Sequence, residues 1–227
     1  MKKAVVLFSS GLDSSTVLAI ANSEGYQLHC LTFDYGQRHS VEIEIAKKAI
    51  SKLKFSVHHK IARIDLRVFG GSALTDDIAV PKNCIDDEFQ TIPVTYVPAR
   101  NMIFLSYAIG YAETVGASDV FIGVNQIDYS QYPDCRAEFV EAFQTCANLG
   151  TKAGSDGAKF IIHAPLQFMH KRDIIKLGLS LGVDYSNTIT CYDPVDDISC
   201  GICQACHLRL EAFKAAGIPD PIRYVQA

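Results

Sequence analysis

The chain has 227 residues, with 21 lysines and arginines against 25 aspartates and glutamates, so its formal net charge is -4. A hydrophobic share of 48% excludes a disordered chain, and no apolar run approaches the roughly 20 residues of a membrane span. The apolar run at residues 4–8 is shorter than the signal-peptide core of about 7–15 residues, so we expect a buried strand there and a cytoplasmic location. The acidic balance argues against a general nucleic-acid binder.

Strands and helices alternate along the first part of the chain. Short apolar runs predict buried strands at residues 3–8, 27–33 and 56–61, and the stretches between them predict helices at 14–21 and 40–53. In the second of these helices Ile43, Ala46, Ile50 and Leu53 form one apolar stripe. This alternation predicts a parallel sheet with right-handed crossovers.

The second part of the chain continues the alternation after a long break. Residues 70–98 show no periodic pattern and are expected to be irregular. Further helices are expected at 101–115, 136–149, 171–181 and 206–216, and strands at 119–124 and 160–163. We therefore predict an α/β fold, a Rossmann-like parallel sheet with helices on both faces over residues 1–185, followed by a small helical segment at 186–227 packed on it.

The segment that follows the first strand has the composition of an anion-binding turn. Residues 8–15 read FSSGLDSS and lie between the first strand and the first helix. At the carboxyl end of a parallel strand, small residues let backbone N–H groups approach an anion, and the helix N-terminus attracts negative charge. Asp13 in such a site implies a bridging Mg²⁺. A Ser/Asp helix cap is the alternative explanation.

This turn matches neither the Walker A loop nor the G-x-G-x-x-G motif. It resembles the S-G-G-x-D-S pyrophosphate loop of the N-type ATP pyrophosphatases, which adenylate a substrate oxygen and release pyrophosphate. Ser10 stands where that pattern has its first glycine, so we expect it to adopt a backbone conformation that glycine adopts freely. The resemblance implies ATP as the nucleotide, with the adenine near residues 32–34.

Five further motifs occur in a fixed order along the chain. They are DYGQRH at 34–39, VPARN at 97–101, DYSQYPDCR at 128–136, TITCY at 188–192 and CGICQAC at 200–206. Together they resemble the 7-cyano-7-deazaguanine synthases of queuosine biosynthesis, over nearly the whole chain. Ile189 stands where that family usually carries tryptophan, and Gln131 where it usually carries glycine.

The resemblance implies an ATP-dependent ligase that converts 7-carboxy-7-deazaguanine and ammonia to 7-cyano-7-deazaguanine through adenylated carboxylate and amide intermediates. It also implies ammonia taken from solution, a homodimer, and no nucleic-acid or membrane partner. The implied catalytic residues are Asp13, Arg100 and Lys171. The implied nucleotide-binding residues are Phe8, Ser9, Ser10, Gly11, Leu12, Asp13, Ser14, Ser15, Thr16, Val17, Leu18, Phe33 and Arg38, and the implied substrate-binding residues are Asn101, Asp128, Tyr129, Tyr132, Asp134 and Arg136.

Each of these assignments has a simpler alternative. Arg38 is equally well explained as a solvated helix start, and Lys171 as a surface lysine. The loop at 128–136 has the composition of a Tyr/Pro-stabilised Ω-loop. For the whole chain, a tRNA-thiolating pyrophosphatase would require a basic surface, which the net charge does not support. A zinc-stabilised regulatory protein with a degenerate nucleotide site would account for Ser10.

The eight cysteines of the chain are unevenly distributed. Cys191, Cys200, Cys203 and Cys206 follow the spacing C-x8-C-x2-C-x2-C, and we expect Cys206 to begin the last helix. Four thiolates suit tetrahedral Zn²⁺, and a closed shell of four makes the zinc structural. An iron–sulfur cluster, a Cys203–Cys206 redox pair, and His207 in place of one cysteine are the alternatives. A disulfide framework is disfavoured because no secretion signal is present.

Overall fold

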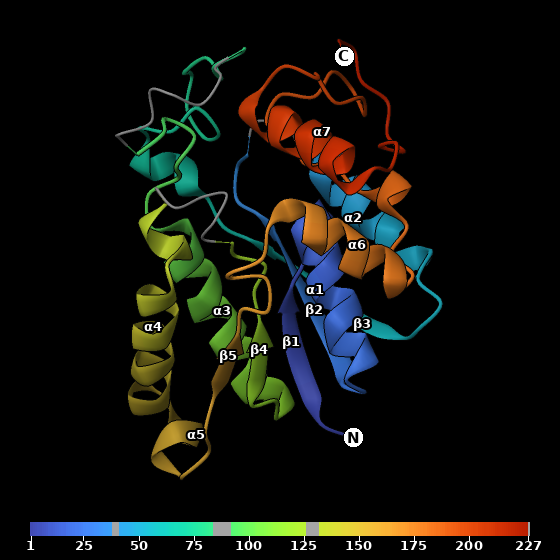
Figure 1. Cartoon of the computed structure of the whole chain (residues 1–227). Coiled ribbons are helices and arrows are strands. Elements are labelled where there is room, and N and C mark those ends of the chain that lie inside the picture. Colours follow the sequence, from blue (N-terminus) through green and yellow to red (C-terminus); the bar gives the residue numbers. More distant parts are fainter. Residues whose placement is uncertain (38–40, 84–91, 126–131, 227) are drawn as a thin grey trace.

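The computed structural model describes residues 1–37, 41–83, 92–125 and 132–226 and contains one five-stranded parallel sheet. The strands are β1 (Lys3–Leu7), β2 (Gln27–Asp34), β3 (Val57–Arg63), β4 (Asp119–Phe121) and β5 (Ile161–His163). Their order across the sheet is β3-β2-β1-β4-β5, so the chain moves outward from β1 in one direction and then returns to its other side (Figure 1). This order confirms the Rossmann-like parallel sheet that the sequence predicts.

The central strand β1 is buried on both faces because its side chains alternate between two apolar layers. Val5 and Leu7 belong to the core on one face, and Ala4 and Val6 belong to the core on the other. A strand of this kind reads as a continuous apolar run, and that is why the sequence identified it.

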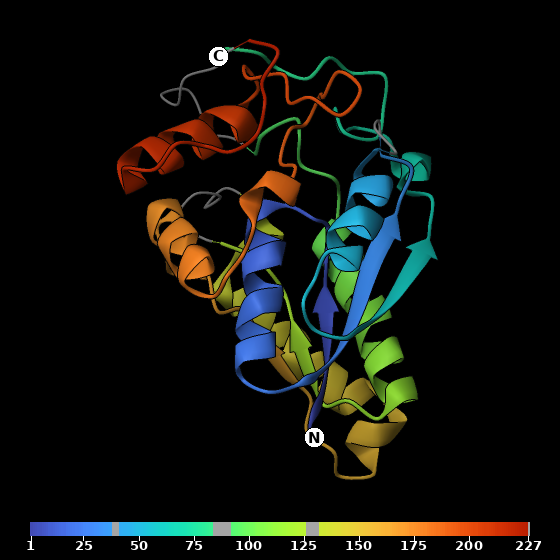
Figure 2. The same ribbon diagram turned by 90° about the vertical axis from the view of Figure 1, so that its right-hand side faces the viewer.

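Helices cover both faces of the sheet (Figures 1 and 2). The longer ones are α1 (Leu12–Ser23), α2 (Val41–Ser51), α3 (Arg100–Val115), α4 (Ala137–Gly150), α6 (Lys171–Ser180) and α7 (Gln204–Ala216), and α5 is a single turn (Lys152–Ser155). Short 3-10 helices lie at Leu66–Phe69, Pro133–Cys135 and Tyr185–Asn187. Helices α3 and α4 contribute to one apolar core, whereas α1, α2, α6 and α7 contribute to the other.

The predicted elements all occur, with differences at their ends. Strand β4 ends at Phe121, three residues before the predicted end, because its pairing with β5 ends there, after which the N–H of Ile122 donates to the carbonyl of His163. Helix α7 begins at Gln204, so Cys206 lies in its first turn and Cys203 is the residue before the helix. The described parts of residues 70–98 contain no regular helix or strand, as predicted.

The reversal of strand order at β1 fixes where a ligand-binding crevice forms. The chain continues from β1 to β2 on one side and from β4 to β5 on the other, and open α/β sheets bind ligands at the carboxyl ends of two such neighbouring strands. The N-terminus lies at one end of the molecule, and α7 and the C-terminus lie at the other, beyond the carboxyl end of β1 (Figure 1). Within the described ranges, no helix has both the length and the apolar character that a membrane crossing requires.

Candidate active site and metal centre

A cavity of about 260 Å³ occupies this crevice. It is lined by the segment after β1, residues 8–15, which we call the phosphate loop after the motif that it resembles. Ser10 in that loop has a φ of 57° and is fully buried, so it adopts the left-handed conformation that the sequence comparison anticipated. Its Oγ donates to the carbonyl of Ser9 at 2.5 Å, and its own carbonyl accepts from the N–H of Ile189 at 3.1 Å. Serine replaces glycine here because surrounding hydrogen bonds hold the strained turn.

The hydroxyls of the loop bond to the loop itself. Ser14 Oγ accepts from the N–H of Ser9 at 3.2 Å and donates to the carbonyl of Gly11 at 3.2 Å. A Cβ placed on Gly123, in the loop after β4, would lie 3.3 Å from the Ser14 nitrogen. The two loops therefore approach each other so closely that a glycine is favoured at residue 123, a position that the sequence analysis missed.

Asp13, which lines the cavity, forms an ion pair with Lys171, which is not among the lining residues. Lys171 Nζ lies 2.8 Å from Asp13 Oδ2 and 3.1 Å from Oδ1, and the lysine side chain is 8% exposed. Lys171 is the first residue of α6, and Asn125 supports its position by donating to the carbonyls of Leu166 and Met169 in the preceding turn. Lys171 is thus no ordinary surface lysine, since its ammonium group is buried beside the phosphate loop.

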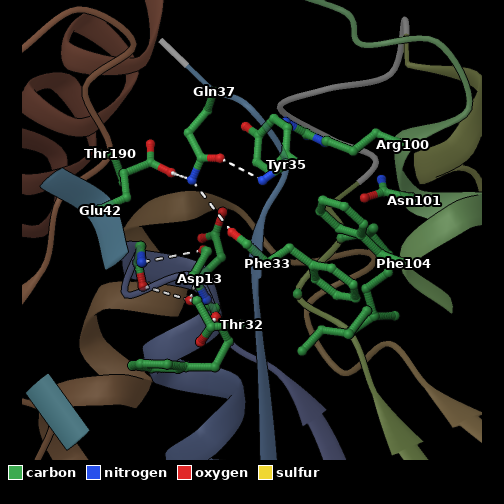
Figure 3. A pocket seen from close by; sticks show the side chains of 18 of the residues that line it. Asp13, Thr32, Phe33, Tyr35, Gln37, Glu42, Arg100, Asn101, Phe104 and Thr190 are labelled. Atoms are coloured by element: carbon green, nitrogen blue, oxygen red, sulfur yellow. Dashed lines mark hydrogen bonds between the residues drawn. The ribbon is translucent and has the colours of Figure 1, made fainter. Parts of the chain in front are cut away.

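Arg100 lines the opposite wall of the cavity at the start of α3 (Figure 3). Burial acts to lower the pKa of its guanidinium, but the neighbouring Tyr35 and Asp134 outweigh this and raise the pKa above its usual value. The charge of Arg100 is therefore permanent. The residue before it, Ala99, has a φ of 55°, which turns the chain sharply into the helix.

An apolar wall lies beside the polar groups, at the end of β2. Phe33 and Phe104 stack in parallel with their ring centroids 4.0 Å apart, and both line the cavity. Thr32 donates through Oγ1 to the carbonyl of Phe8 at 2.6 Å, which joins β2 to the phosphate loop. A flat apolar surface next to an anion-binding turn has the character of a nucleotide site.

Glu42 and Gln37 line the same cavity and come from the start of α2 and the loop before it. Gln37 Oε1 accepts from the N–H of Tyr35 at 2.8 Å, and its Nε2 donates to Glu42 Oε2 at 3.5 Å. Burial raises the pKa of the Glu42 carboxyl to about 7, against the opposing effects of Arg100 and Gln37. Burial and the nearby Glu42 raise the pKa of Tyr35 to about 12. The sequence analysis quoted part of this motif but assigned no role to Tyr35, Gln37 or Glu42.

The structure brings most of the predicted nucleotide-binding residues together. The predicted residues that line the cavity are Phe8, Ser9, Gly11, Leu12, Asp13, Ser14, Phe33, Arg100, Asn101 and Tyr132. Thr16, Val17 and Leu18 differ, because they lie further along α1 and are buried, with Val17 and Leu18 in the same apolar core as α6. Thr16 Oγ1 instead contacts the hydroxyl of Tyr185 at 2.7 Å. Ser15 is likewise absent from the cavity wall.

Not all of the predicted substrate residues within the described ranges line the cavity. Asp134 is buried and its Oδ2 accepts from the N–H of Asn101 at 3.0 Å, so it caps α3 and does not line the cavity. Arg136 is exposed and precedes α4. Cys135 lines the cavity, but burial raises the pKa of its thiol to about 12, which disfavours a nucleophilic role. Arg38, Asp128 and Tyr129 lie outside the described residues.

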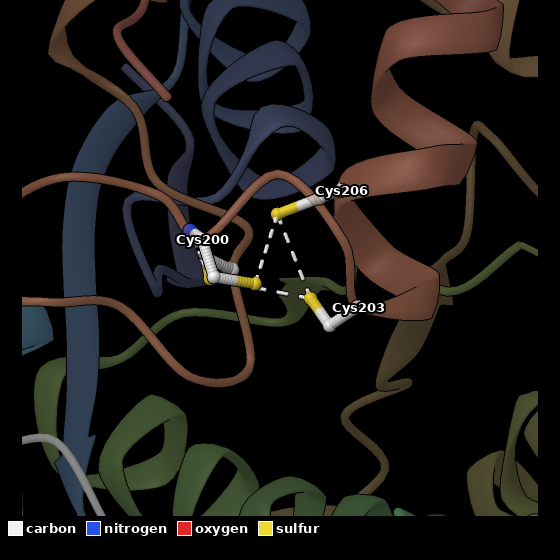
Figure 4. Close-up of side chains that lie close together, drawn as sticks. Cys200, Cys203 and Cys206 are labelled. Carbon is white, nitrogen blue, oxygen red and sulfur yellow. Dashed lines mark hydrogen bonds between the residues drawn. The ribbon is translucent and has the colours of Figure 1, made fainter. Parts of the chain in front are cut away.

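A four-cysteine cluster lies next to the phosphate loop. The sulfurs of Cys191, Cys200, Cys203 and Cys206 all lie within 4.8 Å of one another, and all four residues are buried. The S···S distances are 4.0 Å for Cys191–Cys203, 4.0 Å for Cys200–Cys206 and 3.5 Å for Cys203–Cys206. Figure 4 shows Cys200, Cys203 and Cys206 with their sulfurs directed toward one another. Tetrahedral bonds of about 2.3 Å to one ion place sulfurs about 3.8 Å apart, so the cluster has the dimensions of a mononuclear metal site.

Backbone groups complete this metal centre. The N–H groups of Asp193 and Cys200 donate to Cys191 Sγ at 3.3 and 3.2 Å, which favours the thiolate form that binds metals. Asn83, in the irregular segment, donates through its N–H to the carbonyl of Ile202 at 2.8 Å. This bond holds the turn between Cys200 and Cys203 in place. Among the described residues, His207 is not a member of the four-ligand group, so the alternative in which it replaces a cysteine is not supported.

The strand order and the loops at the carboxyl ends define a nucleotide-binding α/β protein with an appended cysteine metal centre. The profile of the family described as Queuosine biosynthesis protein QueC matches residues 3–217, and the chain belongs to this family. Two relatives named 7-cyano-7-deazaguanine synthase are similar over nearly their full lengths. The one from Geotalea uraniireducens is 56% identical over 99% of this chain and 98% of its own, and the one from Paramagnetospirillum magneticum is 57% identical over 99% of both.

Solved structures show the same fold at low identity. The NMN synthetase of Francisella tularensis has a TM-score of 0.53 at 17% identity and covers 96% of this chain and 78% of its own. A predicted subunit of tRNA methyltransferase from Methanocaldococcus jannaschii has a TM-score of 0.50 at 16% identity and covers 99% and 92%. These two similarities concern the fold alone.

Proposed function

We propose that this chain is an ATP-dependent ligase that converts 7-carboxy-7-deazaguanine and ammonia to 7-cyano-7-deazaguanine in queuosine biosynthesis. Its family and the name shared by relatives with about 56% identity support this activity. The observation that carries the chemistry is the buried Lys171–Asp13 pair beside the phosphate loop, because it supplies a cation and a carboxylate where a triphosphate would lie.

In this proposal the loop at residues 8–15 binds the phosphates of ATP, and the apolar wall of Phe33 and Phe104 borders the adenine. Lys171 and Arg100 stabilise the charge that develops when a carboxylate oxygen of the substrate attacks the α-phosphate and pyrophosphate leaves. Arg100 suits this task since its guanidinium keeps its charge, and its fork can bind two phosphate oxygens. The enzyme's main contribution is to hold the reacting groups together.

Adenylation solves a leaving-group problem twice. A carboxylate does not react with ammonia, because its leaving group would be oxide. The acyl adenylate has AMP as its leaving group, so ammonia displaces it to give the amide. A second adenylation, on the amide oxygen, lets that oxygen depart with AMP and leaves the nitrile. We propose AMP and pyrophosphate as the nucleotide products.

Two metal ions fit the residues present. The carboxylate of Asp13 lines the cavity beside the phosphate loop and is the kind of hard oxygen ligand that Mg²⁺ prefers. When bound there, Mg²⁺ neutralises the charge of the departing pyrophosphate. The four cysteines fit Zn²⁺, which in a closed shell of thiolates stabilises the fold. An iron–sulfur cluster fits less well, because its thiolates bind different iron atoms and lie further apart than 3.5–4.0 Å.

The other substrates and partners complete the proposal. We propose that Asn101 and Tyr132, which line the cavity, border the deazapurine together with Asp128 and Tyr129, and that Asp134 and Arg136 support this loop. Arg38 is proposed to contact the phosphates. Ammonia enters from solution, the enzyme forms a homodimer in the cytoplasm, and no nucleic acid takes part.

The test is direct. The purified protein is incubated with ATP, Mg²⁺, ammonium and 7-carboxy-7-deazaguanine, and the products are separated, identified and quantified by mass spectrometry. We expect the nitrile, with two AMP and two pyrophosphate per nitrile formed. A protein that releases no pyrophosphate with this acid contradicts the proposal, and release that depends on tRNA instead would favour a tRNA-modifying pyrophosphatase.

A further inference from the structure

Glu42 is a carboxylate in the cavity to which the proposed function gives no task. It belongs to the first turn of α2, whose neighbouring residue Ile43 is buried and also lines the cavity. Figure 3 shows the carboxylates of Glu42 and Asp13 on one side of the cavity and Arg100 across from them. Glu42 thus faces the space between the phosphate loop and the residues that border the substrate.

Gln37 holds this carboxylate in place. Its Oε1 accepts from the Tyr35 N–H at 2.8 Å, and its Nε2 donates to the carbonyl of Phe33 at 3.4 Å and to Glu42 Oε2 at 3.5 Å. The amide therefore connects the end of β2 to the carboxylate. A neutral donor at this distance orients the group without neutralising it, so the carboxylate can still accept a proton.

The surroundings of Glu42 bring the pKa of its carboxyl close to neutral pH. The charged groups that share its cavity in the described part of the chain are Arg100 of α3 and Asp13 of α1, and the other titratable groups there are Tyr35, Tyr132, Cys135 and Tyr192. Burial raises the pKa of Glu42 to about 7, while Arg100 and Gln37 act in the opposite direction. A group with a near-neutral pKa both takes up and releases protons readily at the operating pH.

The reaction requires such a group, because ammonia must lose three protons to become a nitrile nitrogen. In the first stage the lone pair of ammonia forms the C–N bond, the bond to AMP breaks with its electron pair, and the nitrogen releases one proton. In the second stage the amide oxygen attacks the α-phosphate of another ATP, the bond from that phosphate to pyrophosphate breaks with its electron pair, and the nitrogen releases a second proton. The bond to AMP then breaks with its electron pair, and the third proton leaves as the triple bond forms.

We propose that Glu42 is the catalytic base that accepts these protons from the nitrogen. The inference rests on the proposed function, since it concerns the same reaction. The other candidates in the cavity are less suitable. Asp13 is occupied by Lys171 at 2.8 Å, and Cys135 has a thiol pKa of about 12 and is rarely ionised. Asp134 accepts from the N–H of Asn101 and does not line the cavity.

Hydroxylamine separates adenylation from proton transfer. It traps acyl adenylates as hydroxamates without a base, because it is largely uncharged at neutral pH and strongly nucleophilic. In E42Q we expect hydroxamate formation from 7-carboxy-7-deazaguanine and ATP to stay within a few-fold of the wild-type rate. Amide and nitrile formation with ammonia should fall by about 100-fold or more. The matched control is E44Q, which changes an exposed glutamate on the same helix and should leave both rates unchanged.

The outcomes are distinct. If E42Q lowers both rates equally, Glu42 serves adenylation or structure, and the proposal is overturned; unchanged amide formation overturns it as well. If the wild-type protein makes neither hydroxamate nor amide, the proposed function itself is at fault. Melting temperatures of wild type and variant show that the comparison concerns folded protein.

The pH dependence of the wild-type enzyme provides a second test. At a constant concentration of free ammonia, amide formation should decline below a pH near 7 as Glu42 becomes protonated, while hydroxamate formation should not. In E42D, where a carboxylate remains, we expect this decline to persist. A rate of amide formation that does not depend on pH in this range rules out Glu42 as the base.

Discussion

The backbone N–H of Ile189 donates to the carbonyl of Ser10, and the two atoms lie 3.1 Å apart. Ile189 is two residues before the first cysteine of the metal centre, and Ser10 is the strained residue of the phosphate loop. A Cβ on Gly11 would lie 3.5 Å from the carbonyl of Ile189. The metal centre and the phosphate loop therefore share a direct backbone contact, and a change at one should be felt at the other.

Loss of the metal should therefore affect both stability and nucleotide binding. We expect chelation, or Cys203→Ser, to lower the melting temperature by roughly 10 °C or more, since a loss of several kcal/mol shifts a domain of this size by about 2–4 °C per kcal/mol. The affinity for ATP should fall as well, because Ser10 loses the partner that holds its carbonyl. Scanning calorimetry and titration calorimetry measure the two effects.

Cys146→Ser is the matched control, because Cys146 is an exposed thiol on α4. It should change neither quantity. If the metal-free protein binds ATP with unchanged affinity, the backbone contact between Ile189 and Ser10 does not couple the two sites.

The backbone strain at Ser10 predicts an unusual order of variants. Ser10→Ala and Ser10→Gly both remove the hydroxyl, but only glycine relieves the left-handed conformation, which costs other residues about 1–2 kcal/mol. We expect the glycine variant to be more stable than the alanine variant by about 1 kcal/mol in urea denaturation. Ser10→Val should be the least stable of the three, because a β-branched side chain tolerates this conformation poorly. A glycine variant weaker than the alanine variant contradicts this reasoning.

The Lys171–Asp13 pair predicts separate effects on activity and stability. Lys171→Met leaves the partly buried Asp13 carboxylate without its partner, so we expect destabilisation by about 3 kcal/mol and a loss of pyrophosphate release of about 100-fold or more. Asp13→Ala should lose comparable activity while the protein remains folded. Pyrophosphate release and circular dichroism measure these effects, with the exposed Lys176→Ala on α6 as control. Full activity of Asp13→Ala would remove the assignment of the phosphate site.

Glu42 predicts a pH dependence of stability. Burial raises its pKa in the folded protein to about 7, above the ordinary value of 4.5. Between these two values the folded protein keeps a proton that the unfolded chain has released, so the free energy of unfolding should fall as the pH rises from about 4.5 to 7. Glu42→Gln should make the curve flatter in this range, and Glu44→Gln should not. Urea denaturation at several pH values tests this, and equal slopes in wild type and Glu42→Gln would contradict it.

The fold was largely predictable because its signals are local. Buried parallel strands such as β1 are continuous apolar runs, and their alternation with helices determines the topology. The ends of elements were less predictable. Helix α7 begins at Gln204, before the predicted Cys206, since the turn between Cys200 and Cys203 leads directly into it.

The site was predictable where a motif lies on one loop and less so where the residues are assembled by folding. Asp13 and Ser10 belong to one turn, whereas the pairing of Asp13 with Lys171 joins residues far apart in the chain. Asp134 shows the limit of composition, because the polar loop did not reveal that this carboxylate accepts from the N–H of Asn101 in the first turn of α3. The rule that parallel strands direct their carboxyl ends to one crevice could have identified Glu42, since it follows the end of β2 closely.

The parallel stack of Phe33 and Phe104 has an optical consequence. The chain contains no tryptophan, so its ultraviolet emission comes from ten tyrosines, and the signal of those at the cavity, such as Tyr35 and Tyr132, overlaps with that of tyrosines elsewhere. Phe104 is only partly buried and lies on the cavity wall. A single tryptophan at this position would be the only one in the protein, and its emission would follow the arrival of a nucleotide in real time.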